Sequence, residues 1–186
     1  MLSDSTADIA LSVSKNLKEE VFRDTFASID LNNDGFVTLD EYHLHDTQPS
    51  GFYYVDPIKK GWGEQLYREL RNTKYNTSFN YRQFINFHCK VVVAISRAML
   101  EPFDIDGNGV VAGRELRLFQ PEALKIRNNM TPFAKQLSLE LRYRYTDFLN
   151  YPYDFSLNRL TAKNAAISTL ILCQLRLEAI QNGLFE

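Results

Sequence analysis

The sequence predicts an all-α protein built from repeated helix–loop–helix units. Two twelve-residue segments, 30–41 and 104–115, share one pattern of oxygen-bearing side chains around a glycine. Each lies between stretches in which apolar residues recur every three or four positions, the spacing of one face of an α-helix. With 45% hydrophobic and 24% charged residues among 186, the chain has the composition of a globular protein with a buried core.

The first of these segments follows a long apolar stripe. Apolar residues recur at helical spacing from Ile9 to Ile29, which predicts one amphipathic helix before position 30. After the segment, Tyr42 and Leu44 begin a short helix, which the sequence Pro49-Ser50-Gly51 should end. The first unit is therefore expected to be helix, loop, helix.

The second segment has the same surroundings. An apolar stripe from Val91 to Phe103 leads into it, and the stretch from 84 to 100 can form one continuous connection. Pro102 lies in the last turn of this stripe and should distort the helix there. The helix that follows begins at Leu116, and Pro121 should stop it.

Calcium coordination explains the residue types of segment 30–41. Oxygen side chains occupy positions 1, 3, 5, 9 and 12, and Gly35 occupies position 6. Calcium is a hard cation that takes six to eight oxygen ligands, and alternate side chains of a tightly curled loop can converge on one point. A glycine at position 6 permits the positive φ that the curl requires. The expected ligands are Asp30, Asn32, Asp34, the backbone carbonyl of Phe36, Thr38 acting through water, and Glu41 with both carboxylate oxygens.

Segment 104–115 repeats this pattern with Gly109 at the bend. Position 9 is Ala112, which has no side-chain oxygen, so we expect water in that place. A single match could be an acidic surface turn, but two matches between apolar helical stretches make that explanation a poor one. The expected ligands are Asp104, Asp106, Asn108, the backbone carbonyl of Val110, and Glu115.

These two loops resemble the calcium-binding loops of the EF-hand superfamily. In that superfamily hands work in pairs joined by a short antiparallel bridge through loop position 8, so the resemblance implies two partner loops. Segment 72–83 fits the frame with Phe79 at position 8, and segment 150–161 fits it with Leu157 there, each within a Ser-apolar-Asn triplet. Because both segments lack the acids and the closing Glu, we expect neither of them to bind calcium.

The resemblance therefore implies four EF-hand-like units in two paired lobes, with hands one and three active and hands two and four degenerate. The N-terminal lobe is expected at residues 1–90, with loops 30–41 and 72–83. The C-terminal lobe is expected at residues 91–186, with loops 104–115 and 150–161, and it ends in a helix from Asn158 to Gln181.

Composition and motifs argue against other classes of protein. The formal net charge of −2 gives no electrostatic reason to expect a nucleic-acid partner. The sequence shows neither a run able to span a membrane nor a secretory signal, so we expect a cytoplasmic protein. Cys89 and Cys173 lie in apolar helical sequence and are expected to be reduced, with a disulfide as the alternative. His43 and His45 are poorly spaced for zinc, and no catalytic motif is evident, so we expect no enzyme.

The leading function is reversible calcium binding, with two ions per chain and magnesium as a competitor. Length, loop spacing and aromatic content resemble the invertebrate sarcoplasmic calcium-binding proteins, and this resemblance implies a compact cytosolic buffer, expected as a monomer. Thirteen Phe and ten Tyr against three Met favour a stiff, closed core over a Met-rich sensor groove. Two alternatives stay open: a calcium sensor that binds a partner protein, and a calcium-regulated binder of a small apolar ligand, similar to the coelenterazine-binding proteins and photoproteins.

Overall fold

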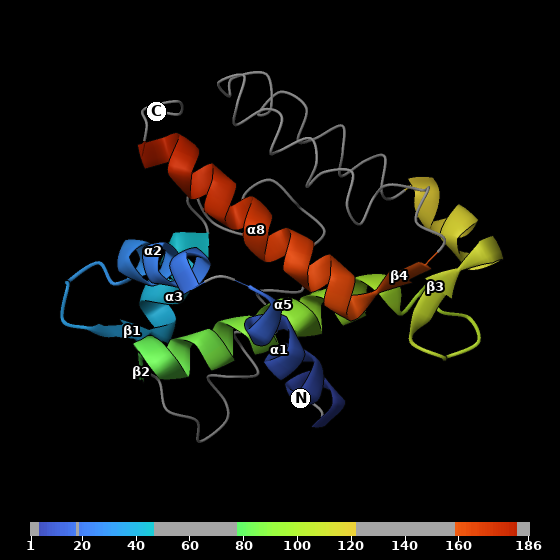
Figure 1. Ribbon diagram of the computed structural model, residues 1–186, viewed down its shortest axis with the longest axis horizontal. Helices are drawn as coiled ribbons and strands as arrows, with labels where there is room; N and C mark the ends of the chain where they lie inside the picture. The colour runs from blue at the N-terminus through green and yellow to red at the C-terminus, as the bar shows by residue number, and fades with distance from the viewer. Residues whose placement is uncertain (1–3, 18, 47–77, 122–158, 182–186) are drawn as a thin grey trace.

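The computed structural model describes residues 4–17, 19–46, 78–121 and 159–181, and these residues are mostly helical (Figure 1). Several sequence expectations lie outside the described residues. These expectations concern the end of the first exit helix at 49–51 and the loop positions 72–77 and 150–158. The whole segment 122–158 lies outside the described residues.

Two helices precede the first loop, so the prediction of a single helix from Ile9 to Ile29 is wrong. Helix α1 covers Asp4–Asn16 and helix α2 covers Glu19–Ile29. The apolar stripe is buried on both sides of the break, with Val13 on α1 and Phe22 on α2 in the core. Asn16, the last residue of α1, is of a type that disfavours a helix interior. The apolar spacing continues across the break, so the sequence pattern did not reveal it.

A short antiparallel ladder closes the first loop. Strand β1 (Phe36–Thr38) pairs with strand β2 (Ser78–Asn80), and helix α3 (Leu39–Asp46) follows β1 directly. In this register Val37 lies opposite Phe79, which confirms the predicted partner at position 8. The second loop has a matching ladder between β3 (Val110–Ala112) and β4 (Arg159–Thr161). After β4 the chain enters helix α8 (Ala162–Gln181).

The second ladder corrects the predicted partner by three residues. Leu160, not Leu157, lies opposite Val111. This register places Leu160 in the core, and the Thr161 hydroxyl then accepts a hydrogen bond from the Asn164 backbone N–H at 3.2 Å. That is the contact of a helix N-cap, so the helix also begins later than predicted.

Helix α5 (Tyr81–Leu100) is one uninterrupted helix of 20 residues, which confirms the continuous connection. Its first turn is fixed by a capping box: the Asn80 side chain accepts from the Gln83 backbone N–H, and the Gln83 side chain accepts from the Asn80 N–H, both at 3.0 Å. The helix ends just before Pro102. This is expected, because proline has no backbone N–H to donate to a helical hydrogen bond. The helix after the second loop covers 113–121, and the predicted stop at Pro121 lies at the edge of the described residues.

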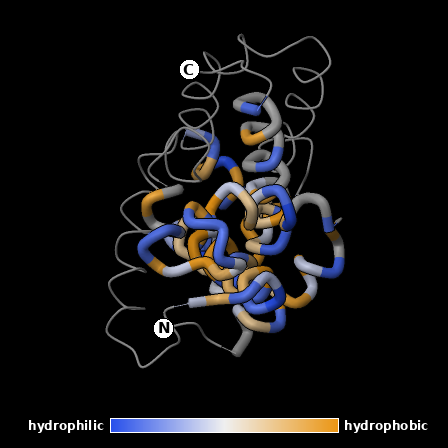
Figure 2. The backbone as a smooth tube through the Cα atoms, turned by 90° about the vertical axis from the view of Figure 1, so that its left-hand side faces the viewer, coloured by the Kyte–Doolittle hydropathy of each residue, from blue (hydrophilic) through white to orange (hydrophobic). Residues whose placement is uncertain are grey.

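The core lies where α1, α5 and α8 pack together (Figure 1). Its buried residues come from both sides of residue 90, and α5 passes through that position without a break. Figure 2 shows apolar and polar stretches alternating along the described helices, as expected for helices with one buried face. None of these helices combines the length and hydrophobicity needed to span a membrane. The largest cluster contains, among others, Ala10, Val13, Phe22, Tyr42, Phe84, Val91, Val92, Val93, Ala166 and Leu170.

Candidate metal centres

In the first loop (30–41), backbone N–H groups turn inward onto acidic side chains. The Asp30 carboxylate accepts from the N–H of Asp34 at 3.1 Å and from that of Gly35 at 2.9 Å. The Asp34 carboxylate accepts from the Phe36 N–H at 2.9 Å, and the Asn32 side-chain oxygen accepts from the Asp34 N–H at 3.0 Å. These contacts curl the chain so that the predicted ligand positions 1, 3 and 5 share one side of the loop.

Glu41 returns to the beginning of the same loop. One carboxylate oxygen accepts from the Leu31 N–H at 3.2 Å, and the other accepts from the N–H and the hydroxyl of Thr38 at 2.9 and 2.8 Å. Burial raises the pKa of Glu41, but the hydrogen bonds from Thr38 and from the backbone of Leu31 and Asn32 outweigh it, so that the net pKa is lowered. The closing carboxylate is thus held in its charged form inside the loop.

The second loop (104–115) repeats the same network at matching positions. The Asp104 carboxylate accepts from the N–H of Asn108 at 3.1 Å and from that of Gly109 at 2.8 Å. The Asn108 side chain accepts from the Val110 N–H at 2.8 Å. Glu115 accepts from the Ile105 N–H at 2.8 Å, as Glu41 does from Leu31. The two predicted loops therefore fold alike although they are far apart in the sequence.

The glycine at position 6 has the backbone conformation that the sequence analysis required. Gly35 has a φ of +82° and Gly109 a φ of +79°. Residues other than glycine rarely adopt this left-handed backbone conformation, so a residue with a Cβ would be strained at either bend. No heavy atom lies within 4 Å of an added Cβ at these glycines, so backbone conformation, not crowding, is what selects glycine.

Carboxylates gather most closely in the second loop. Asp104, Asp106 and Glu115 each offer an oxygen, and these three oxygens lie within 4.8 Å of one another. Carboxylate and carbonyl oxygens are the ligands that Ca²⁺ prefers, so the donor set fits this cation. The first loop differs in having Asn32 at position 3, the place of Asp106, so its acids at ligand positions are at 1, 5 and 12.

The two loops differ at position 9. In the first loop the Thr38 hydroxyl both donates to Glu41 and accepts from the Glu41 backbone N–H at 3.2 Å, which caps helix α3. In the second loop Ala112 has only its backbone N–H, which reaches the Glu115 carboxylate at 3.4 Å. The sequence predicted this missing oxygen. It did not reveal the backbone donors at position 2, because main-chain N–H groups leave no trace in a residue pattern.

Three reactive or polar side chains outside the loops, those of Tyr42, His88 and Cys89, are buried. The Tyr42 hydroxyl is hydrogen-bonded to Nδ1 of His88, and both residues are buried. Burial raises the pKa of the adjacent Cys89 thiol to about 12, so the thiol stays protonated at neutral pH. Cys89 is a free cysteine, as expected. The side chains of His43, His45 and Cys173 lie outside the described residues.

Comparison with models of known protein families gives a match in the first hand. The family model of the EF hand matches residues 22–43, which include most of α2, the first loop and the start of α3. This match supports the EF-hand superfamily and indicates calcium binding. Searches of curated proteins and of solved structures found no match.

Proposed function

We propose that the chain binds two calcium ions reversibly, at loops 30–41 and 104–115, and serves as a calcium buffer. The observation that carries this proposal is the repeated network: in both loops the position 12 carboxylate accepts from the N–H at position 2, and the position 1 carboxylate accepts from the N–H groups at positions 5 and 6. A surface turn has no need of such convergence. Each loop has three carboxylates at ligand positions, and a bound divalent cation would offset most of their negative charge.

The ligands of the first ion are proposed to be Asp30, Asn32, Asp34, Phe36, Thr38 and Glu41, and those of the second Asp104, Asp106, Asn108, Val110 and Glu115. Bound calcium supplies a hard positive centre that these oxygens surround. For each loop we expect a dissociation constant of about 10⁻⁷–10⁻⁵ M, the range of intracellular hands with a similar charge, with magnesium as a competitor.

The four-hand arrangement in two paired lobes is part of this proposal. The two ladders support it, because each active loop pairs through position 8 with a strand that is followed directly by a long helix. With Leu160 at position 8, the fourth loop spans 153–164, and positions 1, 3 and 12 are Tyr153, Phe155 and Asn164. Loops two and four therefore lack the acids that calcium needs.

A buffer related to the sarcoplasmic calcium-binding proteins, monomeric and cytoplasmic, is the form of this function that we propose, rather than an enzyme. The packing of the first hand supports a body that stays closed. Phe79 stacks on Phe87 with ring centroids 4.3 Å apart, and Tyr42 meets the Phe87 ring edge-on at 5.2 Å. Separating such rings exposes large apolar surfaces, which opposes the groove that a sensor presents.

Titration calorimetry with calcium tests the stoichiometry and the site assignment together. We expect two ions per wild-type chain and one ion in Glu41→Gln and in Glu115→Gln. Each substitution replaces the charged, two-oxygen carboxylate at position 12 of one loop with a neutral amide that has one oxygen. Glu101→Gln is the matched control, since Glu101 is an exposed neighbour of the second loop and is not a ligand. Four bound ions, no bound ion, or two ions in Glu115→Gln would contradict the proposal.

A further inference from the structure

Helix α5 connects the two loops, which lie at opposite ends of the described structure (Figure 1). At its N-terminal end, Asn80 both pairs with Phe36 of the first loop and caps the helix. At its C-terminal end, the Leu100 carbonyl accepts from the N–H of Asp104, the first ligand position of the second loop, at 3.1 Å. One helix thus begins on one loop and ends on the other.

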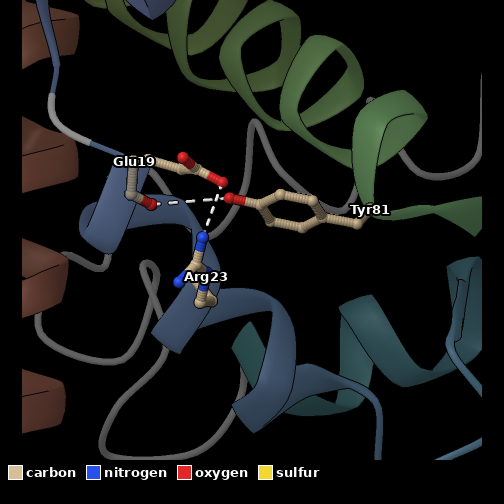
Figure 3. Close-up of polar contacts among 3 residues, drawn as sticks. All are labelled: Glu19, Arg23 and Tyr81. Atoms are coloured by element: carbon tan, nitrogen blue, oxygen red, sulfur yellow. Dashed lines mark hydrogen bonds and ion pairs between the residues drawn. The ribbon is translucent and has the colours of Figure 1, made fainter.

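Contacts with α2 fix the first turn of α5 to the first hand. The Tyr81 hydroxyl points to the backbone carbonyl of Glu19 at 3.5 Å, beside the ion pair of Glu19 with Arg23 (Figure 3). The ring of Tyr81 also meets Phe26 edge-on, with centroids 5.4 Å apart. Phe26 lies one turn before the first loop, and its carbonyl accepts from the Asp30 N–H at 2.9 Å.

Helix α8 makes the same connection in the opposite direction. It starts at β4, whose Leu160 pairs with Val111 of the second loop, and it then runs across the molecule to α2, the helix that enters the first loop (Figure 1). There the buried Gln174 side chain donates to the Asp24 carboxylate at 2.9 Å. Each loop is therefore paired with a strand that leads into a helix, and this helix reaches the other loop in the case of α5 and the entering helix α2 in the case of α8.

Both connecting helices are held along their length by the core. Val91, Val92 and Val93 in the middle of α5 are fully buried, and Ala166 and Leu170 of α8 belong to the same cluster. Close-packed side chains resist bending and sliding, so a change in orientation at one end of such a helix reaches the other end. Ordering one loop also removes part of the entropy that the second loop would lose on binding.

We infer that the two calcium loops are positively coupled through α5 and α8, with the Gln174–Asp24 contact as one of the links. This inference rests on the proposed function, because it needs both loops to bind. Coupling between distinct sites is typically about 5- to 150-fold in affinity. We expect at least about a fivefold coupling, so that occupation of either loop raises the affinity of the other by at least this factor.

The first test compares the affinity of each loop with the other loop loaded or disabled. Calcium titration of Glu41→Gln and Glu115→Gln gives the affinity of the single remaining loop, and the wild-type titration gives the coupled pair. We expect each single loop to bind at least about fivefold more weakly than it does when its partner is occupied. Two independent binding steps of unchanged affinity would overturn the coupling but leave the proposed function intact. Absence of any binding would instead overturn the proposed function.

The second test removes a link without touching a ligand. Asp24→Ala should reduce the coupling factor while leaving the first loop's own affinity in the Glu115→Gln chain unchanged. Asp24→Asn keeps an oxygen for Gln174 and should preserve the coupling, and Asp8→Ala removes an exposed acid from helix α1 as a charge control. If Asp24→Ala weakened calcium binding at the first loop equally in the wild-type chain and in the Glu115→Gln chain, the effect would be local to the first loop. That result would overturn the role of this contact.

Amide hydrogen exchange gives a readout that does not depend on fitting binding curves. In the Glu115→Gln chain, where calcium can load only the first loop, we expect added calcium to slow exchange in α8 and in the β3–β4 ladder. The calcium-free chain and the Glu41→Gln, Glu115→Gln double variant serve as references. Protection confined to residues 19–46 and 78–84 would overturn the inference, because the effect would then stop at the first hand.

Discussion

Single residues set how firmly each loop holds its closing carboxylate. Thr38 contributes both a hydroxyl and a backbone N–H to Glu41, whereas Ala112 contributes only a long backbone contact to Glu115. The helix that follows also starts differently in the two loops, since Gly113 has a φ of +52°. The first loop is therefore the more fully preorganised of the two.

Thr38→Ala should weaken calcium binding at the first loop and cost about 1 kcal/mol of stability, the usual loss for a Thr cap. Because the pKa of Glu41 is lowered in the folded chain, its contribution to the stability of the metal-free protein is present above the unfolded pKa and is lost as pH falls. The cost of the substitution should accordingly shrink in acid. Urea unfolding at neutral and acidic pH, with calorimetry for calcium, measures both effects.

Thr38→Ser is the matched control, because it keeps the hydroxyl and should retain most of the affinity and the stability. If Thr38→Ala bound calcium as tightly as the wild type, then the hydroxyl would have no part in holding Glu41.

Cys89 is a second residue whose behaviour follows from its surroundings. Burial raises its pKa to about 12, so the thiolate that reacts with thiol reagents is scarce in the folded protein. In a Cys173→Ser chain, Cys89 is the remaining cysteine, and it should be labelled slowly at pH 8 when folded and rapidly in urea. The raised pKa also means that stability should fall as pH rises from about 9 towards 12. Rapid labelling of the native chain would contradict this.

At the scale of elements, each loop depends on a three-residue ladder and on the helix that follows it. Both partner strands end in a capping residue, Asn80 before α5 and Thr161 before α8, and each side chain accepts from the N–H three residues later. The register of a ladder decides which apolar side chain enters the core, since a shift changes every pair. In the second ladder this side chain is Leu160, which is 1% exposed.

Leu160→Ala should therefore destabilise the protein by about 2–5 kcal/mol, the usual cost of emptying a buried leucine site, and weaken calcium binding at the second loop. Leu157→Ala is the informative comparison, because the frame expected from the sequence alone placed Leu157 opposite Val111. Thermal unfolding and calorimetry of both variants distinguish the two frames. A larger effect from Leu157→Ala would contradict the observed register.

At the scale of the whole molecule, calcium should stabilise the chain without exposing a large apolar surface. Phe22 and Phe84 are among the deeply buried rings, and exposing each would cost about 1.5–3 kcal/mol. Binding should add about 2.7 kcal/mol per site when free calcium exceeds the dissociation constant a hundredfold. The measurements are the melting temperature and the fluorescence of an apolar-surface dye, each with chelator and with calcium.

We expect the melting temperature to rise and the dye signal to fall or stay level. A several-fold rise in dye fluorescence, together with calcium-dependent capture of an amphipathic helical peptide, would support the sensor alternative instead. A chromophore that copurifies with the chain would support the alternative of a small-ligand binder.

The sequence by itself determined the features that depend on local chemistry. Oxygen side chains at fixed spacing, with glycine at position 6, identified both loops, and helical periodicity identified the stretches beside them. The partner of Val37 could also be predicted, because the resemblance to EF hands implies a paired loop and segment 72–83 fits its frame with Phe79 at position 8. The loops and the helical stretches follow from interactions among residues close in the chain.

Only the tertiary structure decided the rest. The break between Asn16 and Glu19 interrupts neither the apolar spacing nor the burial, so no local pattern marked it. A similar triplet at 156–158 suggested the wrong partner for Val111, because the register of a ladder is chosen by which side chain fills the core, and that depends on residues far away in sequence. For the same reason the contact of α8 with α2 could not be foreseen, since it joins helices that meet only after the chain has folded.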